Sequence, residues 1–332
     1  MKAVHFSAYG QPDEVCTCIE VPDPGAPTAG EVLIEIIAAA INPADLLMIE
    51  NLYPGPVPPA QLGIEGAGRI IRMGPDINTL AVGDHVISLD RANWAQRVRV
   101  PAKRVVKIPK ELSFHDAAML KANPPSAHLL LKDYVDLKEG DWVIQNAANS
   151  AVGRHLIRLA GERGIKTINI VRRESLIEEL SNIGADLVIV DAIDLAEQVR
   201  KKIGVDANIP LAIDAVAGAA CMRLAECLSN GGIVVNYGFL SGDPCEITPE
   251  QAIVRGISLT GFWLVDFMQR STPDEICAMY ANMAGKFLDG TLSVPVEATY
   301  PIENAKKALG HAYRENRNGK ILLLPNGPIE DK

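Results

Sequence analysis

The spacing of hydrophobic positions changes character near residue 120. Before that point the chain contains short alternating or apolar runs such as "EVLIEIIAAA", "GRIIRMG", "DHVISL" and "AQRVRVP", separated by Gly, Pro, Asn and Asp. A period of two residues is typical of strands with one buried face. Many short strands at close spacing predict a β-rich, barrel-like domain. The segment "SFHDAAMLKAN" then predicts a helix start, with Ser113 as N-cap and Asp116 three residues later.

After residue 140 strands and helices alternate. "DWVIQNA" and "KTINIVRR" predict strands, and each is followed by an amphipathic run that ends at a glycine, "SAVGRHLIRLAGERG" and "ESLIEELSNIG". The same alternation continues to "IVVNYG". Strands separated by helices of about 10 to 15 residues predict βαβ units, and therefore a parallel sheet with helices on both faces.

The last part of the chain predicts two helices, "TPDEICAMYANMAGKFLDG" and "PIENAKKALGHAYRENR", and a final strand, "GKILLL". We expect this tail to pack on the first, β-rich domain. A length of 332 residues suits about two domains. We therefore predict an α/β protein with a discontinuous first domain, residues 1–120 and 267–332, and an inserted domain, residues 121–266.

The turn between the strand "WVIQNA" and the helix that follows it is a candidate nucleotide site. A dinucleotide fingerprint needs three small residues at G-x-G-x-x-G spacing, and these positions hold Ala148, Ser150 and Gly153. The match is degenerate, but the helix N-terminus favours a phosphate group; the alternative is an ordinary strand-to-helix turn. The cofactor-binding residues predicted for this turn are Asn146, Asn149, Ser150, Ala151, Val152 and Gly153.

Two arginines indicate which dinucleotide is bound. An acidic residue at the end of the second strand would bind the ribose hydroxyl of NAD, but Arg172 and Arg173 stand there. Guanidinium groups attract a 2′-phosphate and can bind it in a bidentate manner, so we predict NADPH. For Arg173 a solvated surface position is the alternative. Tyr237 and Gly238 follow a later strand and are predicted to contact the cofactor, whereas Asp214 could do so or cap the next helix.

Composition argues against several classes of protein and is typical of a globular enzyme. Hydrophobic residues make up 48% of the chain and charged residues 22%, and the net charge of −9 argues against nucleic acid as the main partner. Without an apolar, uncharged run of about 18 residues, we expect no membrane span. The N-terminus "MKAVHFSAYGQPDEV" enters a strand pattern directly, and we expect a cytoplasmic protein. The six cysteines are expected to be free thiols.

The β-rich domain, the inserted nucleotide domain and the run "GIEGAG" together resemble the medium-chain dehydrogenase/reductase superfamily. The resemblance covers nearly the whole chain. It implies a GroES-like catalytic domain and a Rossmann domain with a doubly wound parallel sheet. Zinc-containing members read G-H-E where this chain has Ile64 before Glu65, and they carry a cysteine ligand near "NPAD", where this chain has none. Because catalytic zinc needs three protein ligands, we predict a metal-free site.

Within the superfamily, "INPADLLMIENLY", "KANPPSAHLLL", "QNAANSAVG", "INIVRR" and "LTGFWLVDF" look similar to the mitochondrial type of 2-enoyl-CoA/ACP reductase. Quinone oxidoreductases share "NPAD" but less of the other segments. The resemblance implies that Tyr53 is the proton donor. Asn42 is expected either to fix the backbone beside the nicotinamide or to hydrogen-bond the substrate, and Asp45 either acts in the site or caps the short helix. It also implies cofactor contacts from Phe262, Trp263 and Leu264, and substrate contacts from Ser126 and Trp263.

Reduction of a C=C bond suits such a site. Hydride addition to the β-carbon of an α,β-unsaturated carbonyl compound places negative charge on the carbonyl oxygen, and the α-carbon then needs a proton. A tyrosine hydroxyl group, whose ordinary pKa is about 10, can supply that proton at neutral pH.

The substrate class stays open. We expect an acyl thioester, which would favour basic residues at the entrance, with Arg69, Arg91, Arg97 and Lys121 as candidates. The alternatives are a small enone, a quinone, or a non-enzymatic NADPH-binding protein. By analogy with related enzymes we expect a homodimer formed through the nucleotide domain.

Overall fold

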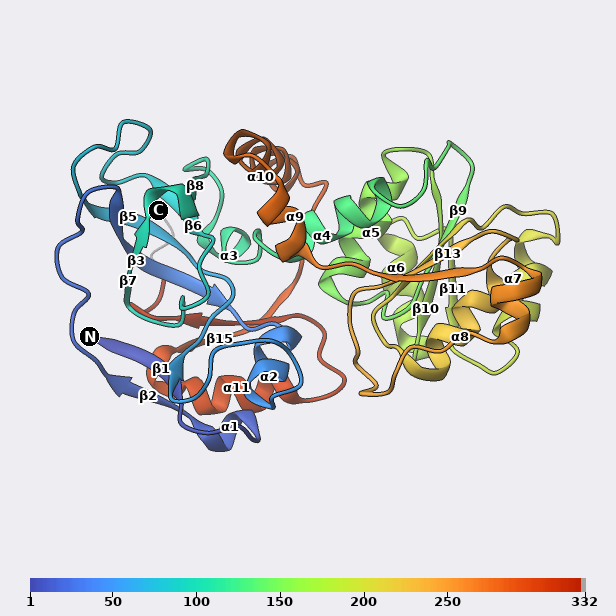
Figure 1. Ribbon diagram of the computed structural model, residues 1–332, viewed down its shortest axis with the longest axis horizontal. Helices are drawn as coiled ribbons and strands as arrows, with labels where there is room; N and C mark the ends of the chain where they lie inside the picture. Colours follow the sequence, from blue (N-terminus) through green and yellow to red (C-terminus); the bar gives the residue numbers. More distant parts are fainter. Residues whose placement is uncertain (330–332) are drawn as a thin grey trace. The chain divides into compact units, whose positions relative to one another are not determined.

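A computed structural model describes residues 1–329, and the chain divides into two compact units (Figure 1). Unit 1 consists of Met1–Ala122 and Ser271–Lys332, and unit 2 is the continuous segment Asn123–Arg270. Unit 1 is therefore made of two stretches that are far apart in the sequence. Each unit has its own sheets and its own hydrophobic core.

Unit 1 is built on two sheets. A small sheet has the order β2-β1-β4, and a larger one has the order β15-β16-β3-β5-β6-β8, with β7 also paired to β3. The long central strand β3, Glu31–Ala40, is buried at most of its positions. The other strands are β1 (Lys2–Phe6), β2 (Cys16–Glu20), β4 (Ala60–Gln61), β5 (Ala67–Met73), β6 (His85–Ser88), β7 (Arg97–Pro101), β8 (Val105–Lys107), β15 (Val296–Pro301) and β16 (Lys320–Leu324).

The C-terminal stretch completes unit 1. Strand β16 pairs antiparallel with the end of β3, Leu322 opposite Ala40, and parallel with β15. The core includes the fully buried Trp94, whose indole N–H donates to the carbonyl oxygen of Ala40 at 3.2 Å. The helical segments of this unit are α1 (Pro12–Val15), α2 (Pro43–Ile49), η1 (Ala102–Arg104), α3 (Phe114–Ala117), α10 (Pro273–Leu288), η4 (Ile302–Asn304) and α11 (Ala305–Tyr313).

Unit 2 contains one six-stranded sheet, and all its strand pairs are parallel. Its order is β11-β10-β9-β12-β13-β14. The strands are β9 (Trp142–Gln145), β10 (Lys166–Val171), β11 (Leu187–Val190), β12 (Leu211–Asp214), β13 (Ile233–Asn236) and β14 (Ser258–Gly261). The helical segments are α4 (Asn123–Lys132), α5 (Ala151–Gly161), η2 (Glu174–Leu176), α6 (Ile177–Asn182), α7 (Leu195–Ile203), α8 (Gly218–Cys227), η3 (Glu250–Val254) and α9 (Leu264–Arg270).

Helices cover both faces of this sheet (Figure 1). One apolar cluster joins the sheet to α7 and α8 through residues such as Val199 and Leu224, and another joins it to α5 and α6 through Ile157 and Leu180. The order of the strands reverses beside β9, so α5 and α6 lie on one face of the sheet, and α7 and α8 lie on the other. The predicted α/β class, with a Rossmann-type parallel sheet and a separate β-rich domain, is confirmed.

The helix predicted to begin at Ser113 does begin there, but it is short. The Ser113 hydroxyl oxygen accepts the N–H of Asp116 at 3.1 Å, and α3 ends at Ala117. Pro124 and Pro125 lack the N–H groups that a continued helix would need, so they stand instead in the first turn of the next helix, α4.

In residues 1–329 no helix combines the length and the apolar character that a bilayer crossing requires.

Gly68 in β5 allows a close approach of two backbones, and it gives a test of the fold. A Cβ atom at this position would lie 1.9 Å from the carbonyl oxygen of Glu35. Gly68→Ala should therefore lower the free energy of unfolding by about 3 kcal/mol, as overpacking does. In the matched control, Gly285→Ala on α10, the Cβ meets open space, and the change should be neutral or stabilising by about 0.5–1 kcal/mol. Chemical unfolding measures both, and equal stability of the two variants would contradict the close approach.

Candidate active site

The turn between β9 and α5 has the geometry of a phosphate-binding turn. Ser150 is the N-cap of α5, and its hydroxyl oxygen accepts the N–H of Gly153 at 3.1 Å. A Cβ atom at Gly153 would lie 2.5 Å from the carbonyl oxygen of Ala148, so only glycine lets the helix start this close to the strand. Ala147 has a positive φ of 45°, which allows the chain to turn tightly between β9 and α5. The backbone N–H groups of Ala151 and Val152, in the first turn of α5, need no partner within the helix and can bind an anion.

A buried hydrogen-bond network holds this turn to the neighbouring strand. The Asn146 side chain donates to Asp214 Oδ1 at 2.5 Å and accepts the N–H of Ala215 at 2.7 Å. Asp214 also accepts the N–H groups of Val216 and Ala217, just before α8. Asp214 thus holds the turn that leads into α8, whereas the N-cap position of that helix is Ala217. Asn146, predicted to bind cofactor, uses its amide to join β9 to β12.

Tyr237 and Gly238 follow β13 at the same edge of the sheet. The Tyr237 hydroxyl group hydrogen-bonds to the side chain of Ser150, and burial raises its pKa to about 12. A Cβ atom at Gly238 would lie 2.9 Å from the carbonyl oxygen of Ala215. Three turns, after β9, β12 and β13, therefore meet in unit 2, as expected for the carboxyl ends of parallel strands.

The remaining predicted cofactor residues of unit 2 differ in exposure. Arg172 is exposed and Arg173 half-buried directly after β10, whereas Val152 is buried in α5. Trp263 is 43% exposed, between β14 and α9. The other predicted residues are the half-buried Asn149, Ala151, Phe262 and Leu264, and the buried substrate candidate Ser126 on α4.

In unit 1, Tyr53 is held by the end of α2. The Leu47 carbonyl oxygen accepts the N–H groups of both Leu52, at 2.8 Å, and Tyr53, at 3.2 Å. The Tyr53 side chain is half-buried in the proline-rich loop. Tyr53 and α2 are therefore one local structure, and whatever fixes the start of α2 also fixes the backbone of Tyr53.

The start of α2 is fixed by a buried polar cluster that the sequence did not reveal. Asn42, the N-cap, donates its side-chain N–H to Glu65 Oε2 at 2.6 Å, and its side-chain oxygen accepts from the ammonium group of Lys320. Asp45 accepts the N–H of Asn42 and, at 2.9 Å, the N–H of Ile64. The predicted capping role of Asp45 is thus confirmed. Lys320 was not predicted, because a lysine before the apolar run "ILLL" looks like the solvated end of a strand.

A second buried lysine lies beside this cluster. The Lys121 ammonium group donates to the carbonyl oxygens of Ile64 at 2.5 Å and Asp90 at 2.7 Å, and Glu65 Oε1 accepts the N–H of Ala122 at 2.8 Å. Burial lowers the pKa of Lys121 to about 7 and also lowers that of Lys320. Lys121 is 9% exposed, so the expectation that it is a basic entrance residue is wrong.

The donor set of this cluster does not suit zinc. Zinc is held by thiolates, imidazoles and carboxylates, but here the two carboxylates, Asp45 and Glu65, already accept hydrogen bonds, and two ammonium groups lie next to them. Among residues 1–329 a single group of three possible ligands is close enough together for a metal, Asp214 with Cys221 and Cys245 in unit 2. Burial raises the pKa of both thiols there, which disfavours the thiolate form that a metal needs.

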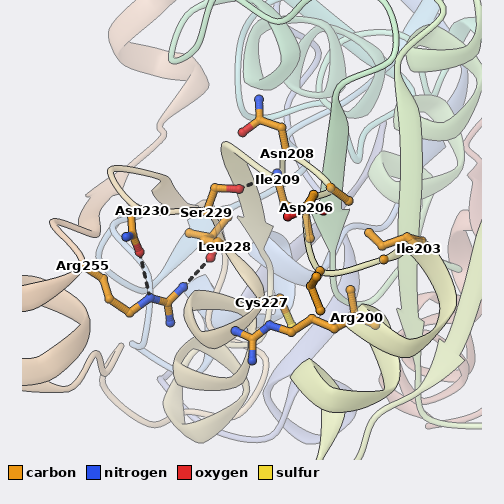
Figure 2. Close-up of a pocket in the computed structure, with 14 residues that line it drawn as sticks. Arg200, Ile203, Asp206, Asn208, Ile209, Cys227, Leu228, Ser229, Asn230 and Arg255 are labelled. Carbon is orange, nitrogen blue, oxygen red and sulfur yellow. Dashed lines mark hydrogen bonds between the residues drawn. The ribbon is translucent and has the colours of Figure 1, made fainter.

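Unit 2 also contains a pocket of about 360 Å³ at the opposite edge of its sheet (Figure 2). It lies near Ile209 and Asn230, which precede β12 and β13, and therefore away from the turns described above. Arg255 donates to Asn230 Oδ1 at 3.4 Å, and both Arg255 and Arg200 bond to Glu226. Because its arginines are already paired with groups of the protein, we assign this pocket no ligand.

The two units correspond to two known domain families. Residues 28–110 match the alcohol dehydrogenase GroES-like domain, and residues 151–281 match a domain described as zinc-binding dehydrogenase. A GroES-like domain combined with a Rossmann-type domain defines the medium-chain dehydrogenase/reductase class. Among residues 1–329, neither the buried cluster of unit 1 nor the Asp214 group of unit 2 has a donor set that suits zinc.

Within that class the chain belongs to the enoyl-[acyl-carrier-protein] reductase family. It is 37% identical to the enzyme named mitochondrial enoyl-[acyl-carrier-protein] reductase in Caenorhabditis elegans, over 96% of this chain and 94% of the relative. Family membership places the chain among the oxidoreductases, as the sequence predicted.

Solved structures show the same fold. A quinone oxidoreductase from Escherichia coli, complexed with NADPH, superposes with a TM-score of 0.89 at 24% identity, covering 98% of this chain and 100% of the other. The complex of Etr1p with NADP and crotonyl-CoA gives 0.86 at 22% identity, covering 97% and 99%.

The expectation of a cytoplasmic protein is wrong, because the relatives from C. elegans, rat, Arabidopsis thaliana and human are all named mitochondrial. The N-terminal pattern on which that expectation rested belongs to strand β1 and its pairing with β2. That pattern reports on the fold and not on the compartment.

Asp45 gives a prediction about pH. Burial raises the pKa of its carboxyl group to about 7, whereas an aspartate in an unfolded chain titrates near pH 4. Between these values the folded chain holds the additional proton, so this group makes the free energy of unfolding fall as the pH rises from about 4 to about 7. Asp45→Asn should flatten that slope, and Asp76→Asn, at an exposed position, should not. Chemical unfolding over this range measures both, and an unchanged slope in Asp45→Asn would refute the assignment.

Proposed function

We propose that this chain reduces the C=C bond of 2-enoyl thioesters with NADPH, using Tyr53 as the proton donor. The observation that carries the proposal is the 37% identity, over 96% of the chain, to an enzyme named enoyl-[acyl-carrier-protein] reductase. Of two solved structures with this fold, one is a complex with NADPH and the other a complex with NADP and crotonyl-CoA. Both complexes are consistent with the reduction of an enoyl thioester by NADPH.

The residues of unit 2 fit the cofactor. The glycine at 153 leaves room that a Cβ would fill, the N–H groups at the start of α5 favour a phosphate, and Arg172 is exposed after β10 to attract a 2′-phosphate. When bound, NADPH supplies the hydride. We assign contacts with the cofactor to the turns after β9, β10, β13 and β14.

The chain's own residues then handle the charge and the proton. Once the β-carbon of the substrate has received hydride, negative charge develops on the thioester carbonyl oxygen, and the α-carbon takes up the Tyr53 hydroxyl proton. Tyr53 recovers a proton from solvent, so the net reaction consumes the enoyl thioester, NADPH and one proton. Asn42 orients the segment that carries Tyr53. Ser126 and Trp263 are proposed substrate contacts.

A quinone and a small enone are the competing substrates, because the same hydride chemistry serves them. A non-enzymatic NADPH-binding protein is the competitor from another class. Oxidation of NADPH, followed by its absorbance with a crotonyl thioester, an enone or a quinone, distinguishes all of these. Preferred turnover of the thioester supports the proposal, and binding of NADPH without turnover of any of them would refute it.

Assembly as a homodimer through unit 2 is part of the same proposal. Strand β14 lies at the edge of the six-stranded sheet and is largely exposed. An open strand edge can pair with another chain. A related enzyme is named as a heterodimer of Etr1p and Etr2p.

Tyr53→Phe tests the proton donor. Because it removes a group that acts mainly in the transition state, it should lower kcat about 100-fold or more and leave NADPH affinity nearly unchanged. Tyr9→Phe, at an exposed tyrosine of the same unit, is the matched control and should leave turnover unchanged. Steady-state kinetics with a crotonyl thioester measures the effect. Full activity of Tyr53→Phe would rule out its role as the acid.

Arg172→Ala tests the preference for NADPH. A charged hydrogen bond to a phosphate contributes about 1.5–3 kcal/mol, so NADPH should bind about 10- to 100-fold more weakly while NADH binding changes little. Lys201→Ala removes one exposed positive charge from the same unit and should affect neither cofactor. Fluorescence titration measures the affinities. An equal loss for NADH and NADPH would mean that Arg172 does not recognise the 2′-phosphate.

A further inference from the structure

Lys320 is the least expected member of the buried cluster in unit 1. It begins the last strand, β16, and only 6% of it is exposed. Removing an ammonium group from water is costly unless hydrogen bonds and opposite charge compensate for it. Its ammonium group donates a hydrogen bond to the side-chain oxygen of Asn42, 278 positions away in the sequence, and the carboxylates of Asp45 and Glu65 lie close enough to act on its charge.

The two charged neighbours determine which way the Asn42 amide points. Its oxygen faces the ammonium group of Lys320, and its nitrogen faces the carboxylate of Glu65 at 2.6 Å. A flipped amide would place its N–H groups against the ammonium and its oxygen against the carboxylate, and both contacts would be repulsive. Lys320 and Glu65 together therefore hold Asn42 in one orientation.

This orientation is passed on to Tyr53 through a short path of backbone. Asn42 is the N-cap of α2, and Asp45 binds the backbone of both Asn42 and Ile64. The other end of α2 holds the backbone N–H of Tyr53 through the Leu47 carbonyl oxygen. A shift at Asn42 therefore moves the whole segment from 42 to 53.

We propose that Lys320 is a positioning residue for the proposed reductase: its buried ammonium group locks Asn42, and with it α2 and Tyr53, in the geometry for proton transfer. The inference rests on the proposed function for its kinetic part only.

Lys320→Met tests this inference, because methionine keeps most of the side-chain volume and removes the charge and the donor. We expect kcat for a crotonyl thioester to fall about 10- to 100-fold, as a displaced catalytic group does, with KM and NADPH affinity nearly unchanged. The backbone N–H groups of residues 44–53 should exchange with deuterium faster than in the parent protein. Lys2→Met is the matched control, since Lys2 forms an exposed ion pair with Glu303, and it should change neither measurement.

The two measurements separate this inference from the proposed function. If the parent protein reduces no thioester, the proposed function fails, and hydrogen exchange alone decides whether Lys320 holds α2. If Lys320→Met folds and both kcat and exchange equal those of the parent, the inference is wrong. It is also wrong if NADPH affinity falls as much as kcat, because the effect is then a general loss of structure. Should Lys320→Met fail to fold, Lys320→Gln, which keeps a donor without the charge, is judged by the same criteria.

Discussion

The balance of charge in a buried cluster of side chains is the constraint on which the rest of unit 1 depends. Asp45, Glu65, Lys121 and Lys320 are all buried, and each would be costly to bury alone. They are tolerated because every one of them bonds to a side chain or to backbone N–H and carbonyl groups. The cluster ties α2, the "GIEGAG" turn, the end of the first stretch and the last strand to one another.

Unit 2 also contains a buried carboxylate, but its hydrogen-bond donors are neutral. Asp214 is fully buried and accepts hydrogen bonds from the side chains of Asn146 and Asn236 and from backbone N–H groups at the start of α8. In both units a buried carboxylate holds the beginning of a helix beside a proposed site. The difference is that the carboxylates of unit 1 have lysines close to them. Such a charge pair resists reorientation more strongly than neutral hydrogen bonds do.

Local signals predicted the elements well and the roles of single residues less well. Ser113 caps a helix as its spacing predicted, because a hydroxyl group at an N-cap needs only the next few residues. Ser150 and Thr272 also cap helices, although no capping role was predicted for them. Asn146 and Lys121 were assigned to ligand contacts, and the structure uses both to hold neighbouring segments together. Their partners lie far away in the sequence. The compartment was misjudged because a strand at the N-terminus carries information about pairing and not about targeting.

The sequence by itself determined the fold class, the parallel sheet, the turn with Gly153 and the family. These properties follow from periodicity, from glycine positions and from motifs, all of which are local along the chain. Only the tertiary structure decided that Lys320 hydrogen-bonds to Asn42 and that Asp214 hydrogen-bonds to Asn146. The same holds for Glu65, which accepts hydrogen bonds from Asn42 and Ala122. No rule of spacing along the sequence predicts such contacts. They arise when strands from opposite ends of the chain pair, and the loss of water then forces every buried charge to find a partner.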